Sequence, residues 1–223
     1  MELSRVEYLG IDRVLKRGTG KLLVQREDAL LVRDCVSGAL LLACKDAADG
    51  LSLLDKYADG CRLLMIPDLA LGRTVFKRYG FTEKLECRQV AYYGKPPSAD
   101  ACVSVRTADA GDLPFLTGCY DLISPGEMAM VVERKSLFLG YAQNRLIGFI
   151  GEHLEGSMGL LYILPEFRRC GYATALEKML ISKTMERGFI PFGQVEKDNQ
   201  SSLRLQKKIG MTPSKKLICW MWK

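Results

Sequence analysis

The segment between Gly159 and Gly188 limits the possible folds of this chain more than any other. An apolar run from Gly159 to Leu164 has the length of a buried strand, and it leads into a turn with two arginines and one glycine. A stretch with apolar residues at helical spacing follows, from Thr174 to Arg187, and Gly188 can end that helix. A strand that turns directly into a helix is typical of an α/β fold, here with a mixed sheet.

Composition places the chain among ordinary globular proteins. Of its 223 residues, 48% are apolar and 26% are charged, which argues against a disordered or fibrous chain. No apolar run approaches the roughly 20 residues that cross a bilayer. The segment from Met1 to Lys16 has the pattern of an amphipathic helix rather than of a signal peptide. We therefore expect a cytoplasmic protein with no membrane partner.

Charge and cysteine placement exclude two further classes. The net charge of +6 is spread over both halves without a block of Lys and Arg. Nucleic-acid surfaces usually have clustered basic residues, so we expect no nucleic-acid partner. The eight cysteines form no Cys-x-x-Cys pair, and His153 is the only histidine. We expect mostly buried free thiols and no metal site.

A Pro- and Gly-containing stretch from Gly94 to Asp100 predicts a linker between two domains, 1–95 and 101–223. The two parts show a similar order of elements. Phe76 to Thr82 also parallels Gln206 to Thr212, because each contains a helix end, a glycine and an apolar residue. We interpret this as an internal repeat. The alternative is two unrelated helices that both end at glycine.

Hydrophobic periodicity and turn residues predict the individual elements. Before the linker we expect a hairpin at 29–44, helices at 50–57 and 69–79, and strands at 62–66 and 85–93. After the linker we expect strands at 102–106, 137–142, 146–154, 159–164, 190–196 and 217–222, and helices at 174–187 and 201–209, with further helices after Asp109 and from Ser124.

The turn before the 174–187 helix combines features that suit a phosphate group. A helix N-terminus leaves backbone N–H groups unpaired and carries partial positive charge. Gly171 allows an anion to approach the backbone closely, and the small Ala173 leaves the helix start uncrowded. Arg168 and Arg169 add positive charge. The alternative is a plain strand-to-helix connection with solvated arginines.

Two motifs in this region resemble those of one superfamily. The run Ile163-x-Pro-Glu-Phe-Arg-x-x-Gly-Tyr-Ala173 resembles the acetyl-CoA motif of the GNAT N-acetyltransferases, Arg/Gln-x-x-Gly-x-Gly/Ala. The stretch Asn199 to Met211 resembles the second GNAT motif, an Asn at a strand end followed by a helix that ends in Gly-Phe. The FR47-like branch is the most similar. The resemblance covers Val103 to Trp222 and implies a GNAT fold in the C-terminal half.

The N-terminal half lacks the first motif. At the corresponding place, Lys45 to Gly50 has no Arg-x-x-Gly-x-Ala, and its aspartates would repel phosphate. Leu69 stands where the second motif has Asn. We interpret this half as a partial, non-catalytic GNAT-like repeat.

The resemblance also implies a co-substrate, acetyl-CoA, and the residues that contact it. The strand before the turn would contact the pantetheine arm, the turn would hold the pyrophosphate, and the start of the second-motif helix would lie near the thiol. The residues so implied are Leu161, Tyr162, Ile163, Arg168, Arg169, Cys170, Gly171, Tyr172, Ala173, Thr174, Asn199, Ser202 and Leu205.

Direct transfer of an acyl group to an amine, as the resemblance implies, requires a base for the amine and an acid or hydrogen-bond donor for the leaving thiolate. Many GNAT members have a Tyr acid four residues before the Gly of the second motif, and here that residue is Gln206. An amide can hydrogen-bond a thiolate but cannot act as the acid, so the acid stays open.

The strand before the phosphate turn offers three candidates for the base. Strand alternation puts Glu152 on one face and His153 and Glu155 on the other. We favour Glu155, with His153 as a neighbour or relay, because partial burial can shift either group toward a neutral pKa. Each also has a structural alternative: a solvated turn carboxylate for Glu155, and hydrogen-bonded scaffold roles for the other two.

These features predict an N-acyltransferase that transfers an acetyl or short acyl group from CoA to the amine of a small molecule or a peptide. The alternative is a non-catalytic acyl-CoA-binding regulatory or sensor module, which Gln206 at the acid position would suit. The acceptor and the oligomeric state leave no signal in the sequence.

Overall fold

The computed structural model describes residues 2–98 and 100–223; Met1, and Ala99 within the expected linker, lie outside the described residues. The chain forms two compact units. Unit 1 comprises Met1–Ala91, Gln194–Leu203 and Thr212–Lys223, and unit 2 comprises Tyr92–Gly193 and Arg204–Met211. In the described chain, no helix is both long and apolar enough to span a membrane.

The sheet of unit 1 is mixed. Its strands lie in the order β1-β2-β3-β4-β11-β5, in which β3 and β4 are parallel and the other neighbours are antiparallel. The strands are β1 (Gly20–Gln25), β2 (Ala29–Asp34), β3 (Leu40–Cys44), β4 (Leu63–Ile66), β5 (Glu83–Ala91) and β11 (Thr212–Trp222).

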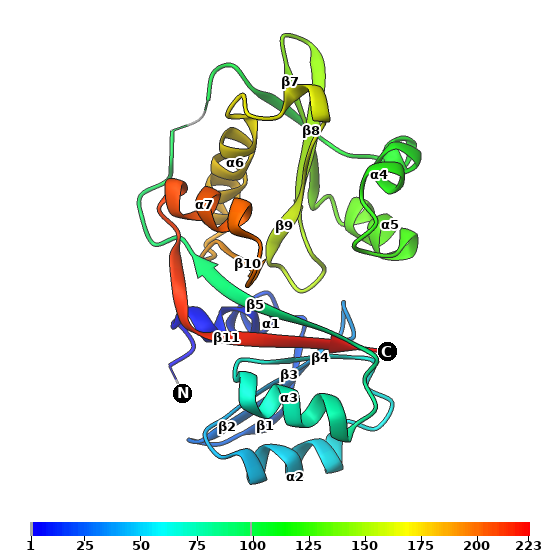
Figure 1. Ribbon diagram of the computed structural model, residues 1–223, viewed down its shortest axis with the longest axis vertical. Coiled ribbons are helices and arrows are strands. Elements are labelled where there is room, and N and C mark those ends of the chain that lie inside the picture. Colours follow the sequence, from blue (N-terminus) through cyan, green and yellow to red (C-terminus); the bar gives the residue numbers. More distant parts are fainter. Residues whose placement is uncertain (1, 99) are drawn as a thin grey trace. The chain divides into compact units, whose positions relative to one another are not determined.

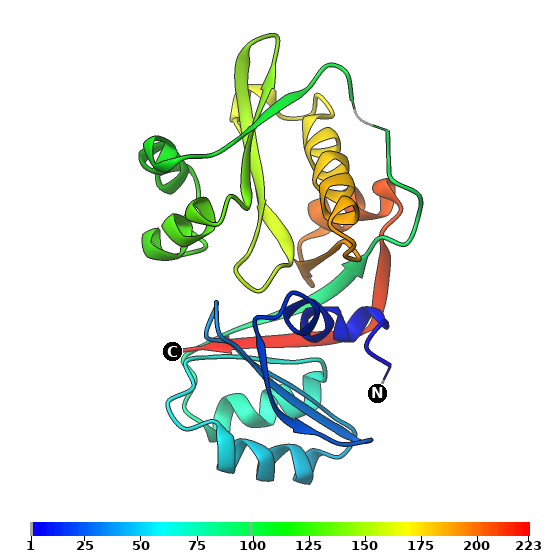
Figure 2. The ribbon, with the colours of Figure 1, turned by 180° about the vertical axis from the view of Figure 1, so that it is seen from behind.

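Helices cover both faces of this sheet (Figure 2). On one face, α1 (Leu9–Lys16) packs Ile11 and Val14 against strand residues that include Val32 and Met65. On the other face, α2 (Ala47–Tyr57) and α3 (Leu69–Arg78) pack against strand residues that include Leu31 and Leu64. The side chains of adjacent strand residues thus pack on opposite faces of the sheet, as strand alternation requires.

The C-terminal strand β11 is placed by long-range pairing. It pairs antiparallel with β4 through Cys219 to Trp222 and with β5 along most of its length. Backbone pairing with β4 and β5, rather than closeness in sequence to unit 2, decides to which unit β11 belongs. The compact units therefore differ from the sequence division into 1–95 and 101–223, because β11 groups with unit 1.

The second-motif helix and its counterpart in the first half have matching ends. The side chain of Asp68 accepts a hydrogen bond from the N–H of Leu71 at the start of α3. Asn199 caps α7 (Gln200–Ile209) in the same way, through the N–H of Ser202. Both helices are followed by a left-handed glycine and then by a strand that pairs with the other. These shared features favour the internal repeat.

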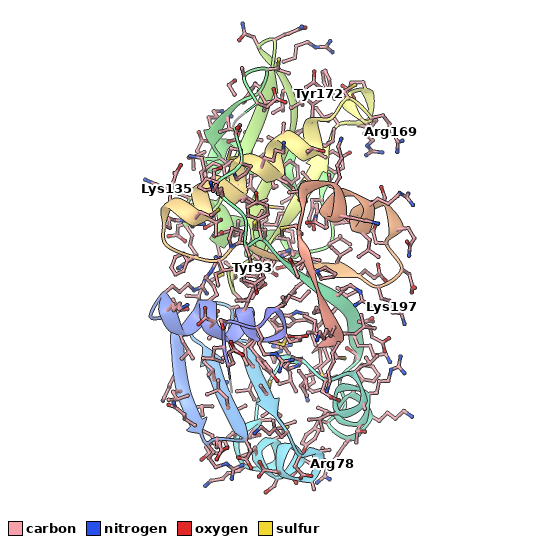
Figure 3. The ribbon with its side chains drawn as sticks, turned by 90° about the vertical axis from the view of Figure 1, so that its left-hand side faces the viewer. Arg78, Tyr93, Lys135, Arg169, Tyr172 and Lys197 are labelled. Carbon is pink, nitrogen blue, oxygen red and sulfur yellow. The ribbon has the colours of Figure 1, made fainter. Side chains whose placement is uncertain are left out.

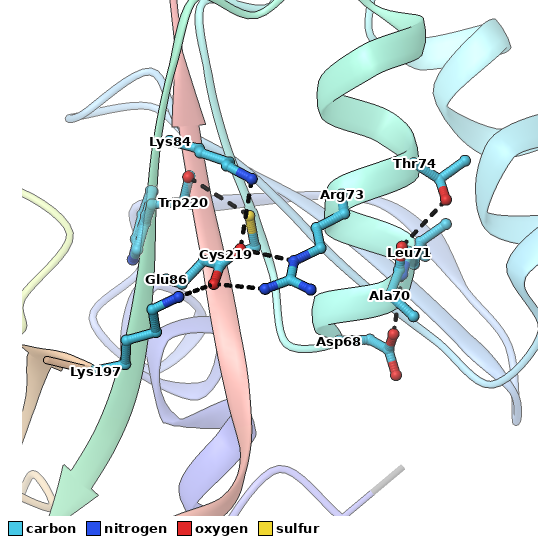
Figure 4. Close-up of polar contacts among 10 residues, drawn as sticks. All are labelled: Asp68, Ala70, Leu71, Arg73, Thr74, Lys84, Glu86, Lys197, Cys219 and Trp220. Atoms are coloured by element: carbon cyan, nitrogen blue, oxygen red, sulfur yellow. Dashed lines mark hydrogen bonds and ion pairs between the residues drawn. The ribbon is translucent and has the colours of Figure 1, made fainter.

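A buried carboxylate joins several elements of unit 1 (Figure 4). Glu86 on β5 accepts hydrogen bonds from Arg73 Nε at 2.8 Å and from Lys197 Nζ at 2.7 Å. Lys84 adds a longer contact at 3.5 Å. The hydrogen bond from Arg73, followed by that from Lys197, lowers the pKa of Glu86 to about 2.

Glu86→Gln should lower the free energy of unfolding by about 2 kcal/mol near neutral pH, because it removes charge-assisted hydrogen bonds to Arg73 and Lys197. A depressed folded-state pKa stabilises the fold above the ordinary value and loses that effect as the pH falls. The difference from wild type should therefore shrink between about pH 4.5 and about pH 2 in urea denaturation. Glu83→Gln, an exposed change on the same strand, is the control. A difference in unfolding free energy between Glu86→Gln and wild type that does not change with pH would contradict a stabilising role of the ionised Glu86.

Unit 2 contains the remaining strands. Its strands lie in the order β10-β9-β8-β7-β6, with β10 and β9 parallel and the others antiparallel. They are β6 (Ser104–Thr107), β7 (Leu137–Ala142), β8 (Arg145–Glu152), β9 (Met158–Ile163) and β10 (Phe192–Glu196), of which β10 continues into unit 1.

Helices also lie on both faces of this sheet (Figure 1). α4 (Leu113–Cys119) and α5 (Pro125–Glu133) lie on one face, where Phe115 and Tyr120 contact the ring of Phe149 on β8. α6 (Tyr172–Glu186) lies on the other, where Leu176 fills the space above Gly140 on β7. The expected α/β architecture with a mixed sheet is confirmed.

The expected elements agree with the observed ones, usually within a few residues, and β1 was missed. Of the amphipathic helix predicted from Met1 to Lys16, the second half is present as α1, and a short 3-10 turn at Val6–Tyr8 precedes it. All eight cysteines are free, as expected, but only Cys61, Cys87 and Cys219 are buried, so the expectation that most of them are buried is wrong. Three others, Cys35, Cys102 and Cys170, are exposed.

Candidate functional site

A bulge separates β9 from its neighbour β10. Leu160 has a left-handed backbone (φ 49°), and the register with β8 shifts between Phe149 and Gly151. In the described chain, the parallel pairing of β9 with β10 is limited to Met158 opposite Gly193. Bulges of this kind bend a strand and end its pairing. The rest of β9, including Leu161 to Ile163, therefore diverges from β10, as the resemblance implied.

The other edge of β9 stays paired with β8. The N–H of Leu164 donates to the carbonyl of Ile147 at 3.0 Å. Because backbone groups alternate along a strand, Leu161 and Ile163 point theirs away from β8. The ring of Tyr162 stacks on Phe149, with 5.6 Å between centroids, and so lies on the α4 face.

Gly148 is required for this close pairing. Its φ is +149°, and a Cβ atom there would lie 2.0 Å from the carbonyl oxygen of Tyr162. No rotamer change relieves an overlap with backbone. The strand that precedes the turn is thus held by a contact that only glycine permits.

Gly148→Ala should lower the free energy of unfolding by about 3 kcal/mol, because β8 and β9 must separate to admit the methyl group. Gly118→Ala is the matched control. It lies in α4 with no atom near the added Cβ, so it should be neutral or slightly stabilising. Urea denaturation measures both. Equal stabilities of the two variants would contradict the observed approach of the strands.

The turn after β9 leads directly into α6 and contains two residues with a left-handed backbone. Arg169 (φ 64°) and Gly171 (φ 89°) are both left-handed, and Gly171 is the N-cap of the 15-residue α6. The helix begins with the N–H of Ala175 donating to the carbonyl of Gly171. Among the described contacts, none uses the N–H groups from Arg169 to Thr174. Left-handed residues just before a helix N-terminus can turn backbone N–H groups toward a common point. Such sites bind anions, and phosphates most often.

The two arginines of the turn differ in role. Arg168 folds back, with its Nε donating to the carbonyl of Ile163 at 3.0 Å and its guanidinium over the ring of Tyr162. Arg169 is exposed and extends from the turn near Tyr172 (Figure 3). Cys170 is also exposed. We conclude that Arg168 fixes the turn, whereas Arg169 is available to a bound anion.

The residues expected on the second motif lie along α7. Asn199 and Ser202 form its N-terminal cap, and Leu205 is half-buried in its middle. Gln206 is buried and points to α6, where its Nε2 donates to Glu177 Oε1 at 2.7 Å. Burial raises the pKa of Glu177 to about 7, and the hydrogen bond from Gln206 opposes that effect.

Glu177 was not among the sequence candidates, although a signal for it existed. With Ala173, Leu176, Leu180 and Thr184 it falls on the face of α6 that is otherwise apolar or uncharged. A carboxylate at such a position is expected to be neutral or partnered.

Glu152 has a scaffold contact in the structure. Its side chain is buried, and Oε1 accepts hydrogen bonds from Thr184 Oγ1 at 2.9 Å and from Arg187. Both donors belong to the C-terminal part of α6 and the residue after it. This contact ties β8 to α6.

The other two base candidates lie together, with a third residue that the sequence analysis missed. Glu155 is buried and accepts a hydrogen bond from Ser157 Oγ. His153 is half-buried and lies over Gly159, where a Cβ atom would approach its Nε2 to 2.7 Å. Glu127, in the first turn of α5, has its pKa raised by burial; His153 opposes the rise and Glu155 adds to it. The three groups therefore interact electrostatically.

A pocket of about 340 Å³ lies beside the start of α5. Its lining includes Thr117, Tyr120, Asp121 and Ser124. Burial, followed by the charges of Glu127 and Asp121, raises the pKa of Tyr120 to about 12. The hydroxyl of Tyr120 therefore stays protonated and can serve as a hydrogen-bond donor at neutral pH.

Comparison with known proteins agrees with this geometry. Residues 137–221 match the family model described as FR47-like protein. A Drosophila protein solved by structural genomics is 16% identical, with a TM-score of 0.72 over 98% of this chain and 90% of that chain. A GNAT-family protein from Novosphingobium aromaticivorans is 17% identical, with a TM-score of 0.60 over 99% of this chain and 98% of the other. The search of curated proteins found no match.

Residues 137–221 thus resemble the FR47-like family, and the solved structures show that the chain has the fold of GNAT proteins. A tandem GNAT protein from the clavulanic acid biosynthesis pathway also has a related fold, with a TM-score of 0.50 at 12% identity over 96% of this chain and 87% of that chain. The GNAT fold with a tandem arrangement, expected from the two motifs and the repeat, is confirmed.

In this chain with a GNAT fold, unit 2 contains most of the residues singled out from the sequence. The bulged strand, the turn and α6 follow one another directly. Glu155 and His153 share a site with Glu127, whereas Glu152 is held by α6 and Arg187. Ser124-Pro125-Gly126-Glu127 had the spacing of a helix cap, and Ser124 does accept the N–H of Glu127. Because the cap explained Glu127, its interaction with His153 and Glu155 was not expected from the sequence.

Proposed function

We propose that this chain is an N-acyltransferase that transfers an acetyl or another short acyl group from CoA to an amine. One observation carries the proposal: the N–H groups from Arg169 to Thr174 lie uncommitted at the N-terminus of α6, directly after a strand that diverges from β10. The GNAT fold supports acyl transfer from CoA in general.

The residues of the turn fit a pyrophosphate group. Arg169 and Gly171 supply the two left-handed positions, and a Cβ atom at Gly171 would meet no neighbouring atom, so the space above the turn is open. The backbone groups of Leu161 and the N–H of Ile163 can bind an extended amide-containing arm, whereas the carbonyl of Ile163 already accepts a hydrogen bond from Arg168. Acyl-CoA would supply the activated thioester. Asn199, Ser202 and Leu205 keep the binding role that the motif implies.

Transfer to an amine requires that the ammonium form lose a proton. We assign this step to Glu155, whose buried carboxylate accepts a hydrogen bond from the Ser157 hydroxyl and forms no ion pair among the described residues. Glu127 and His153 interact with that site and can pass the proton outward. Glu152 is less suited, because Thr184 and Arg187 occupy its Oε1.

The acceptor is an amine of a small molecule or a peptide. The pocket that Tyr120 and Asp121 line gives room for its side chain next to Glu127. The pocket lining contains no basic residue among those that the structure describes. This favours an acceptor that arrives as a cation.

Release of free CoA distinguishes this function from an acyl-CoA sensor. Purified protein should release CoA from acetyl-CoA in the presence of at least one member of a panel of amines, amino acids and peptides, above the rate without amine. Tight binding of acetyl-CoA with no release across the panel and across short-chain acyl donors would favour the sensor.

A further inference from the structure

A buried pair of polar side chains joins α6 to α7 within unit 2. Gln206 Nε2 donates to Glu177 Oε1 at 2.7 Å, and the two residues are 8% and 7% exposed. Glu177 lies in the second turn of α6, shortly after the phosphate-binding turn. Gln206 occupies the position at which the second motif has its Tyr in other members. The pair thus connects the candidate CoA site to the candidate position of the leaving group.

The second oxygen of Glu177 has no partner. Oε2 is buried and receives no hydrogen bond from any residue that the structure describes. A lone ionised carboxylate in such surroundings is costly, whereas the neutral acid is tolerated. Burial raises the pKa of Glu177 to about 7, against the opposing effect of Gln206.

The charged side chains of the elements next to Glu177 form other contacts or are exposed. On β8, Glu152 is engaged with Arg187 and Thr184. On α7, Arg204, Lys207 and Lys208 are exposed. Burial and the Gln206 hydrogen bond shift the pKa of Glu177, without a contribution from these charges. The protonation of Glu177 therefore depends first on its burial and then on the hydrogen bond from Gln206.

A leaving thiolate can only accept hydrogen bonds, so an amide nearby helps it through N–H and hinders it through C=O. One hydrogen of Gln206 Nε2 is directed at Glu177, which fixes the side chain, and the second hydrogen of that nitrogen has no hydrogen-bond acceptor among the described contacts. A mobile Gln206 would present either end of its amide.

We propose that Glu177 is a positioning residue for the acyl-transfer step, holding the amide of Gln206 so that its free N–H can stabilise the leaving sulfur. The assignment rests on the proposed function and adds a residue to it. The neutral carboxyl group is the working form, since ionisation would place an unpartnered charge beside the amide and rearrange the pair.

Two variants and a control test the assignment through kcat, KM for acetyl-CoA and pH profile, between about pH 6 and about pH 9. Wild-type kcat should fall on the alkaline side with an apparent pKa near 7. Glu177→Gln, permanently neutral, should keep most of kcat and lose that alkaline fall. Glu177→Leu should lower kcat by roughly 10- to 100-fold with KM for acetyl-CoA unchanged. Glu186→Gln, exposed near the end of the same helix, should match wild type.

A spectroscopic titration gives a readout independent of turnover. With ¹³C-labelled glutamate, one carboxyl resonance should titrate near pH 7 in wild type and be missing in Glu177→Gln. Melting temperatures establish that the variants are folded. Persistence of the alkaline fall in Glu177→Gln, or wild-type kcat in Glu177→Leu, would overturn this assignment alone. Absence of CoA release by wild type with every amine would overturn the proposed function and this assignment with it.

Discussion

Gly171→Glu should weaken the binding of acetyl-CoA by at least about 100-fold. The substitution places a carboxylate at the mouth of the turn, where the N–H groups from Arg169 to Thr174 would otherwise meet phosphates, and like charges in contact cost several kcal/mol. It also forces a side chain onto a backbone with φ 89°. Isothermal titration calorimetry with acetyl-CoA measures the loss.

The chain supplies a matched control for this change. Gly188 follows the other end of α6, is also left-handed (φ 78°), and also has open space where a Cβ atom would lie. Gly188→Glu therefore carries the same new charge and a similar backbone cost without approaching the turn, and it should bind acetyl-CoA like wild type. Equal affinities of the Gly171 and Gly188 variants would mean that the phosphate site lies elsewhere.

Glu155→Gln should reduce kcat by roughly 10²- to 10⁴-fold, the usual range for removal of a general base. The amide keeps the size of the carboxylate and can still accept the Ser157 hydroxyl, so the fold should be preserved. The reaction loses its proton acceptor, whereas the turn after β9 is unchanged. Acetyl-CoA affinity should therefore stay at the wild-type value while turnover falls.

Initial rates of CoA release at saturating acetyl-CoA and amine measure this effect. Glu133→Gln, an exposed change at the end of α5, is the control for the loss of one carboxylate in the same unit. Undiminished turnover in Glu155→Gln would remove Glu155 from the mechanism. Glu127 and His153, which interact electrostatically in the same site, would then be the remaining candidates for the general base.

The sequence predicted the local elements of the fold well, because helices and strands follow short-range periodicity. β1 was missed because it is an edge strand without a buried face, so it lacks the alternation that marks a half-buried strand. The grouping of β11 with unit 1 has no signal in the local sequence pattern. That placement depends on pairing with β4 and β5, which lie far away in sequence.

The sequence predicted the part of the candidate site whose residues follow one another in a single motif. Gly171 and the start of α6 could be found because a strand, a turn and a helix follow one another in sequence. The left-handed backbone of Arg169 and the folded-back side chain of Arg168 left no such signal, since both depend on tertiary geometry. Glu127 was missed because it becomes informative only beside His153 and Glu155. Glu177 could have been noticed as the one carboxylate on an otherwise uncharged face of α6, but its hydrogen bond with Gln206 depends on tertiary structure.

The stability of the wild-type protein with acetyl-CoA tests the central claim most directly. A ligand at ~100 times its dissociation constant stabilises the folded state by about 2.7 kcal/mol, so saturating acetyl-CoA should raise the melting temperature by several degrees. The same addition should leave Gly171→Glu unchanged. An unchanged melting temperature of the wild-type protein at millimolar acetyl-CoA, or an equal rise in Gly171→Glu, would contradict the assignment of the turn after β9 as the CoA site.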